Sequence, residues 1–94
     1  MEEKTANPNN KLTLEIITPE GFSIKELVDE IVAPGTEGQF GVLPGHISFL
    51  TALDQGPVVY RKDKESKQIG VKGAYLRVMK DHVLVLADSI EVQA

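Results

Sequence analysis

Glycines are the first candidates for chemistry in this sequence, because Gly35, Gly38, Gly41 and Gly45 stand within eleven residues. A glycine-rich loop can hold a phosphate with its backbone N–H groups, but it does so in front of a helix N-terminus. The residues that follow, HISFLTAL, do not predict a helix, and the sequence has no Gly-x-x-x-x-Gly-Lys-Ser/Thr motif. The glycines therefore indicate a backbone bent closely on itself rather than a nucleotide site.

Side chains that could bind a metal or carry acid–base chemistry are few and scattered. The two histidines, His46 and His82, are 36 positions apart, and the sequence has no cysteine. Neither histidine has neighbours at the spacing of a zinc site. Asp29 and Glu30 are adjacent, and adjacent residues of a strand point to opposite faces, so these carboxylates would not share a substrate. The sequence predicts no catalytic residue, no metal and no cofactor.

The elements that carry these residues are short and rich in β-branched side chains. Leu12, Leu14 and Ile16 recur at every second position of the first segment, which is the period of a strand. Eight or more short strands with frequent turn residues predict an all-β fold, a flattened sandwich or barrel. The segment 47–53 is too short to classify. Strands are expected at 11–18, 22–27, 28–33, 40–43, 58–62, 68–72, 74–79, 82–87 and 90–92.

The Pro34-Gly35 pair is expected to end the strand at 28–33. Proline has no N–H to give to a ladder, and glycine accepts positive φ. A second tight turn is expected just after this pair, followed by a new extended piece.

Length and composition limit the class of protein. The 94 residues suffice for one domain with a modest core. The formal charge is −4, and the basic residues of 61–67 are interleaved with acids, so nucleic-acid binding is not indicated. No apolar run approaches the roughly 20 residues of a spanning helix, so direct membrane insertion is not expected. Residues 1–10 lack the apolar stretch of a secretory signal and are predicted to be a disordered lead-in to a single domain at 11–94.

Several short motifs follow one another along the sequence: Glu37-Gly38, Gly41 to Leu43, Pro44-Gly45-His46, Leu50-Thr51, Gly73 to Val78 and Val85 to Asp88. Together they resemble a known family, the epsilon subunit of F-type ATP synthase in its N-terminal domain. The likeness extends from about residue 11 to about residue 92, and its order and spacing are more specific than any one motif. It implies a flattened sandwich of about ten short strands. It also implies a non-catalytic subunit of the central stalk of a proton-translocating synthase, peripheral on the cytoplasmic face of the bacterial inner membrane.

The resemblance further implies partners and contact residues. The partners are the gamma subunit, the ring of membrane c subunits and the rest of the catalytic sector. The turn Glu37-Gly38-Gln39 matches the loop that faces the ring; several family members have an acid where Gln39 stands, so an ionic contact would depend on Glu37. The expected function is to clamp gamma to the ring so that rotation couples ion flow to ATP synthesis. The positions that match residues close to gamma are Thr18, His46 and Thr51.

Two questions remain open at this point, the role of His46 and the function itself, and one absence is expected. His46 is interpreted either as a turn histidine that bonds a backbone carbonyl or as a contact with gamma. In the family an inhibitory helical hairpin follows the sandwich, and because the printed sequence ends at Ala94 we expect it to be absent. The rival function is a free-standing small β-sandwich binding module, which would need an exposed aromatic platform; the sequence offers two Tyr, three Phe and no Trp.

Overall fold

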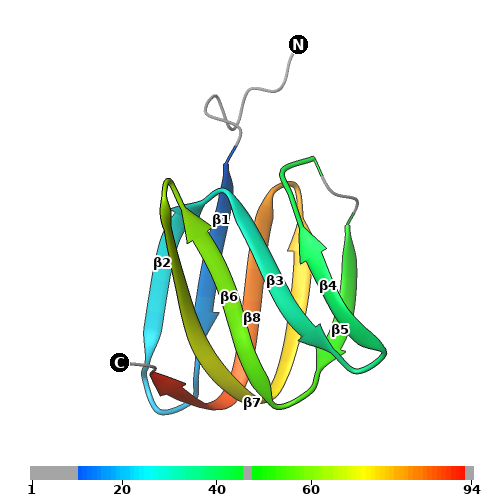
Figure 1. The fold of residues 1–94 in the computed structure, drawn as a ribbon. Helices are drawn as coiled ribbons and strands as arrows, with labels where there is room; N and C mark the ends of the chain where they lie inside the picture. Colours follow the sequence, from blue (N-terminus) through cyan, green and yellow to red (C-terminus); the bar gives the residue numbers. More distant parts are fainter. Residues whose placement is uncertain (1–10, 46–47, 93–94) are drawn as a thin grey trace.

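A computed structural model describes residues 11–45 and 48–92, which form two packed layers of β-strands (Figure 1). None of these residues is helical, and the predicted all-β sandwich is confirmed. The predicted lead-in at 1–10 and His46 lie outside the described residues. The strands are β1 (Leu12–Ile17), β2 (Ser23–Val28), β3 (Glu30–Gly35), β4 (Gly38–Val42), β5 (Phe49–Leu53), β6 (Gly56–Lys62), β7 (Glu65–Met79) and β8 (His82–Val92).

The two layers share the long strands β7 and β8. The first layer has the order β2–β1–β8–β7–β5 and uses residues 82–87 of β8 and 74–79 of β7. The second layer has the order β4–β3–β6–β7–β8 and uses residues 65–72 and 89–92. The described residues thus form eight strands, where the resemblance implied about ten. The count was too high because segments expected to be separate join into β7 and β8.

Both long strands change layer at Gly73 and Asp88. In β7 the buried side chains change from odd positions, ending with Val71, to even positions, beginning with Ala74. Gly73 has φ of 62°, and a Cβ at this position would lie 2.5 Å from Oδ2 of Asp88. Glycine is therefore required where the two strands turn together from one layer into the other.

The strand β3 runs through Pro34 and Gly35, so the expectation that this pair ends the strand was wrong. Pro34 lies opposite Gln39 of β4, and its carbonyl accepts a hydrogen bond from Asp54 N at 2.7 Å. The N and O of one strand residue point to the same side. The position of the missing N–H of Pro34 therefore faces away from β4. On that side the pairing of β3 with β6 already ends at Val32, so the proline removes no hydrogen bond of the sheet.

The turn between β7 and β8 sets their register. Lys80 has φ of 50° and Asp81 has φ of 64°. Two central residues with positive φ are the mark of a type I′ turn, which matches the twist of the strands it joins. The same turn holds its surroundings: Thr13 N donates to the carbonyl O of Asp81 at 2.8 Å, and Gly45 N donates to Oδ1 of Asp81 at 2.7 Å.

Asp29 lies at the bend between β2 and β3, not inside a strand as expected, and is the centre of an ion-pair cluster. Lys11 Nζ lies 2.8 Å from its Oδ1, and the backbone N of Asp63 donates to its Oδ2 at 2.7 Å. Arg61 Nη1 lies 3.4 Å from Oδ2. The hydrogen bond from Lys11, and then that from Asp63, lowers the pKa of Asp29, while the bond to Asp29 raises the pKa of Lys11. The cluster ties the start of β1 to the β6–β7 hairpin.

Replacing Gly73 with alanine is expected to destabilise the fold by about 1–3 kcal/mol, because alanine must adopt positive φ and displace Asp88. Urea unfolding measures the change. The matched control is Gly41→Ala, where a Cβ meets nothing closer than 3.8 Å, and it should leave stability nearly unchanged or raised. Equal stability of the two variants would contradict the corner assigned to Gly73.

Replacing Asp29 with asparagine is expected to remove a contribution to folding stability that is present at neutral pH and lost at acid pH. The folded-state pKa of Asp29 is lowered from 3.8, so its contribution is full above the unfolded-state pKa and is lost as pH falls through the folded value. The variant should be less stable than the parent at pH 7, with a difference that shrinks below about pH 3.8. Urea unfolding from pH 7 to pH 2 measures this. The control is Asp54→Asn at an exposed turn, and a pH-independent difference would argue against the ion pair.

Candidate partner-binding surface

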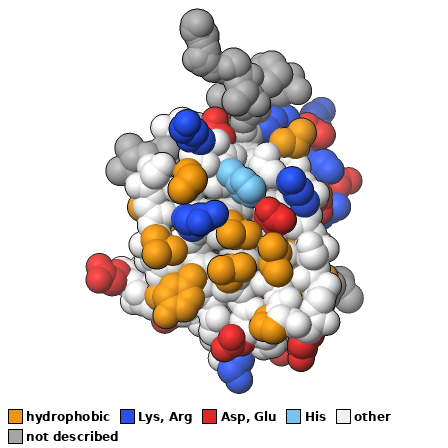
Figure 2. Space-filling view, turned by 180° about the vertical axis from the view of Figure 1, so that it is seen from behind, with side chains coloured by type: hydrophobic (Ala, Val, Ile, Leu, Met, Phe, Trp, Pro, Cys, Tyr) orange, Lys and Arg blue, Asp and Glu red, His pale blue; other side chains and the backbone are white. Residues whose placement is uncertain are grey.

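The outward side of the first layer is covered by apolar side chains (Figure 2). Leu50 is 68% exposed, Tyr75 is 58% exposed and Leu86 is 50% exposed. Among the described residues, every exposed large hydrophobic side chain except Leu43 lies on this side. Antiparallel sheets that face water usually alternate apolar and polar residues, so this is a departure. We call it the apolar face, defined by Ile17, Leu27, Leu50, Ala52, Tyr75, Met79, Leu84 and Leu86.

The apolar face arises because β7 and β8 carry apolar residues at both parities. In β8, Val83 and Val85 point into the core, whereas Leu84 and Leu86 point outward. A strand with two apolar sides normally has both sides covered. Here one side is covered by the second layer and the other is open. Apolar residues at both odd and even positions of a strand are therefore a sequence signal for a binding surface, and the assignment of strands alone does not use it.

The exposed side chains form cross-strand rows rather than isolated contacts. Directly opposed residues of neighbouring strands have Cβ atoms about 5 Å apart. One row runs through Ile17, Leu86, Tyr75 and Ala52. The next row runs through Glu15, Leu84, Arg77 and Leu50.

An open groove of about 650 Å³ lies at the end of the apolar face. Its walls include Ile17, Pro19, Tyr75 and Leu86, so the groove continues the first row toward the β1–β2 turn. A flat apolar sheet with a groove at one end offers a partner both area and a recess, which is what aromatic or aliphatic anchor residues use in protein interfaces.

Charged groups are sparse on the apolar face and differ in their contacts. Oε1 of Glu15 lies 3.1 Å from Nε2 of His82, a hydrogen bond that becomes an ion pair when the imidazole is protonated. Both side chains are partly exposed. Arg77 is exposed and, within 11–45 and 48–92, makes no ion pair or hydrogen bond through its side chain. Two basic groups on this side therefore have no ion pair within the described chain: Arg77, and Lys25 of the edge strand β2, which lies opposite Glu15.

Thr18, predicted on the gamma side, is 4% exposed. Its Oγ1 accepts a hydrogen bond from Phe22 N at 3.2 Å, and its carbonyl accepts one from Gly21 N at 3.1 Å. The side chain thus closes the β1–β2 turn, and it also borders the groove beside Pro19. A contact with gamma stays a prediction, and a second role in shaping the turn is visible.

Thr51, also predicted on the gamma side, lies in the edge strand β5 opposite Leu76. Its side chain is half-buried, and its Oγ1 is 3.4 Å from the carbonyl of Ala52. Leu50 and Ala52, its immediate neighbours, point to the apolar face instead. A contact of Thr51 with gamma stays a prediction, and the outward residues on either side of it, Leu50 and Ala52, were not among the predicted contacts.

The turn Glu37-Gly38-Gln39, predicted on the ring side, projects from the β3–β4 hairpin and is exposed. Gly38 has φ of 128°. Thr36 N donates to the carbonyl of Ala52 at 3.4 Å, which places this turn beside the last residues of β5. The structure brings the predicted ring-side turn close to the strand of Thr51. His46 lies outside the described residues.

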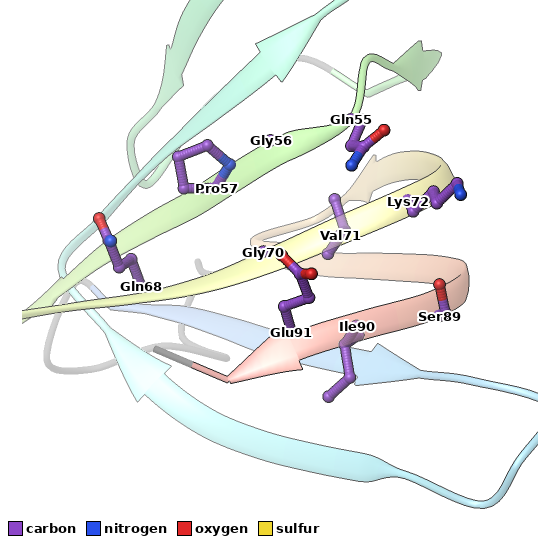
Figure 3. Close-up of a pocket in the computed structure, with 10 residues that line it drawn as sticks. All are labelled: Gln55, Gly56, Pro57, Gln68, Gly70, Val71, Lys72, Ser89, Ile90 and Glu91. Atoms are coloured by element: carbon purple, nitrogen blue, oxygen red, sulfur yellow. The ribbon is translucent and has the colours of Figure 1, made fainter. Parts of the chain in front are cut away.

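A second hollow, of about 740 Å³, lies along β6, β7 and the end of β8 (Figure 3). Gln55, Lys72 and Ser89 gather near one end and Gln68 lies at the other. The lining residues supply one amine and one carboxylate, from Glu91, but no arrangement of nucleophile and base. Nor do the described residues contain a group of three His, Cys, Asp or Glu that could hold a metal ion.

Comparisons with known proteins agree on one family. The model described as "ATP synthase, Delta/Epsilon chain, beta-sandwich domain" matches residues 11–93. An ATP synthase epsilon chain of Thermodesulfovibrio yellowstonii is 49% identical over 82 residues, which are 87% of this chain and 59% of that relative. ATP synthase epsilon chain 2 of Syntrophotalea carbinolica is 48% identical over 83 residues, which are 88% and 60%. The chain thus spans about three fifths of the length of these curated relatives.

Solved structures show the same fold. A chain in the cryo-EM structure of Euglena gracilis mitochondrial ATP synthase, OSCP/F1/c-ring, superposes with a TM-score of 0.81 at 21% identity, covering 98% of this chain and 61% of that one. A chain in the Tetrahymena thermophila mitochondrial ATP synthase central stalk/c-ring structure gives 0.71 at 16% identity, covering 87% and 66%. The described residues contain no helix with the length and hydrophobicity that crossing a membrane requires.

Replacement by alanine is expected to cost much stability for a leucine on the inner side of the first layer and little for one on its outer side. Leu76→Ala removes a fully buried side chain and should cost about 2–5 kcal/mol. Leu50→Ala, in the neighbouring strand but outward, should change stability by no more than about 0.5 kcal/mol. Urea unfolding of both variants tests this. A large loss for Leu50→Ala would mean that Leu50 is packed in the monomer and that the apolar face is smaller than described.

Proposed function

The chain belongs to the family of ATP synthase delta/epsilon chains, and from this membership we propose that it is a non-catalytic subunit of the central stalk of an F-type ATP synthase. It holds the gamma subunit to the ring of c subunits, so that rotation couples proton flow to ATP synthesis. Catalysis belongs to other subunits of the complex. The subunit works at the cytoplasmic face of the bacterial inner membrane, attached through its partners.

The apolar face is the observation that carries this proposal. Monomeric proteins rarely leave a contiguous apolar patch of this kind in water, and larger patches mark protein interfaces. Here Leu50, Tyr75 and Leu86 are each at least half exposed on neighbouring strands. A rigid sheet with an apolar outer side and no catalytic set among the described residues suits a subunit that acts by binding.

Two contact regions follow from the proposal. On the gamma side we assign the apolar face together with Thr51 and His46, while Thr18 supports the groove at its end by closing the β1–β2 turn. On the ring side we assign the turn Glu37-Gly38-Gln39, which is exposed at the tip of a hairpin. The two regions are different sets of residues that meet beside the last residues of β5, so one small body can contact both partners.

The proposal predicts that the chain co-migrates in size-exclusion chromatography with a catalytic sector from the same organism that has been stripped of its own epsilon subunit. Leu86→Asp, which places a charge on the apolar face, should weaken this association at least about tenfold without lowering the melting temperature. The matched control is Gln68→Asp, an exposed position on the outward side of the second layer, which should bind like the parent.

Further variants separate the two contact regions. Glu37→Ala should leave binding to the isolated catalytic sector unchanged and weaken assembly only when the c ring is present. His46→Ala should weaken binding to the isolated sector and also assembly with the c ring present. A folded chain that does not co-migrate would contradict the proposal and favour a free-standing binding module. A fall of several degrees in the melting temperature would identify the replaced residue as structural.

A further inference from the structure

Arg77 occupies the middle of the apolar face. It lies opposite Leu50 of β5 and Leu84 of β8, and its neighbours along the same side of β7 are Tyr75 and Met79. All four are apolar. A guanidinium placed among exposed apolar side chains on a binding surface will be covered when a partner docks.

No carboxylate of the described chain pairs with Arg77. Glu15 is in the same cross-strand row, but two strands away, roughly 10 Å at the usual strand spacing. Glu15 is also bonded to His82 at 3.1 Å. The other arginine of the sequence, Arg61, differs in this respect, because it lies 3.4 Å from Asp29 and 3.7 Å from Glu30.

Burying an unpaired guanidinium is costly, whereas a bidentate bond to a carboxylate compensates for the lost water. We propose that Arg77 binds a carboxylate of the protein partner that docks on the apolar face, and that this ion pair selects the partner and its orientation. The inference rests on the proposed function, in which the partner is the gamma subunit. The matching surface is therefore apolar, with one aspartate or glutamate facing Arg77.

The test measures dissociation of the epsilon-stripped catalytic sector from the immobilised chain. Arg77→Gln should dissociate at least about tenfold faster, because the partner's carboxylate is left buried and unpaired. Arg77→Glu should weaken binding at least about a hundredfold, since like charges then meet. The control is Lys67→Glu, an exposed charge on the same strand in the second layer, which should bind like the parent. All variants should keep the parent's melting temperature.

A second measurement identifies the carboxylate directly. In Arg77→Lys the new amine can be joined to a carboxylate by a carbodiimide, which adds no spacer. A cross-link between position 77 and an aspartate or glutamate of gamma, located by mass spectrometry, is the expected result. A complex that forms without this cross-link would overturn the inference.

The remaining outcomes are also decisive. If Arg77→Leu binds as tightly as the parent, position 77 is an apolar contact and the ion pair is refuted, while the proposed function stands. If the unmodified chain does not bind the sector, both fail. If the chain alone forms a dimer that Arg77→Glu abolishes, the face is occupied by a second copy and gamma is not its partner.

Discussion

The register between β7 and β8 is the constraint on which the rest of this structure depends. The two strands stay paired from Met79 and His82 at the turn to Ile69 and Val92 at the far end. Because they bend together at Gly73 and Asp88, directly opposed residues remain on the same side in both layers. A slip of one residue would turn every buried side chain of a strand outward. The type I′ turn and the glycine corner therefore fix the core of both layers at once.

This shared pair of strands also explains why the two outer sides differ. In the first layer, β7 and β8 carry apolar residues at both parities, which leaves Tyr75 and Leu86 in water. The outward side of the second layer instead has small or polar residues, such as Gly41, Gly70 and Gln68, beside two valines, Val32 and Val59, that are only partly exposed. The molecule thus has one side suited to cover by a partner and one suited to solvent. The asymmetry follows from residue types at alternate positions and requires no conformational change.

The sequence predicted the fold better than the surface. Alternation in segments such as 11–18 reports which residues are on one face of a strand, and enough such segments imply a sandwich. It does not report what covers the other face, so the apolar face of Leu50, Leu84 and Leu86 was missed. The continuation of β3 through Pro34 was missed because proline interrupts a sheet only where a neighbouring strand would accept a hydrogen bond from its N–H. Which strands are neighbours depends on the tertiary fold. The burial of Thr18 likewise depends on the turn that it closes.

On the proposed function the chain must pass force between its two contact regions, and the described contacts supply a short path between the residues assigned to them. The hairpin that carries Glu37 is joined to β5 by the bonds Asp54 N to Pro34 O, at 2.7 Å, and Thr36 N to Ala52 O, at 3.4 Å. The rings of Phe40 in β4 and Phe49 in β5 also pack edge to face, with their centroids 5.7 Å apart.

Gly35 adds a packing constraint to this path. A Cβ at this position would lie 2.8 Å from the ring of Phe40 and from the carbonyl of Gly38, so any larger residue would have to displace the ring or the turn. The ring-side turn is therefore bonded to the strand that presents Leu50 on the apolar face. On the proposed function, a load applied at the turn reaches the gamma-side surface through these hydrogen bonds and packed rings.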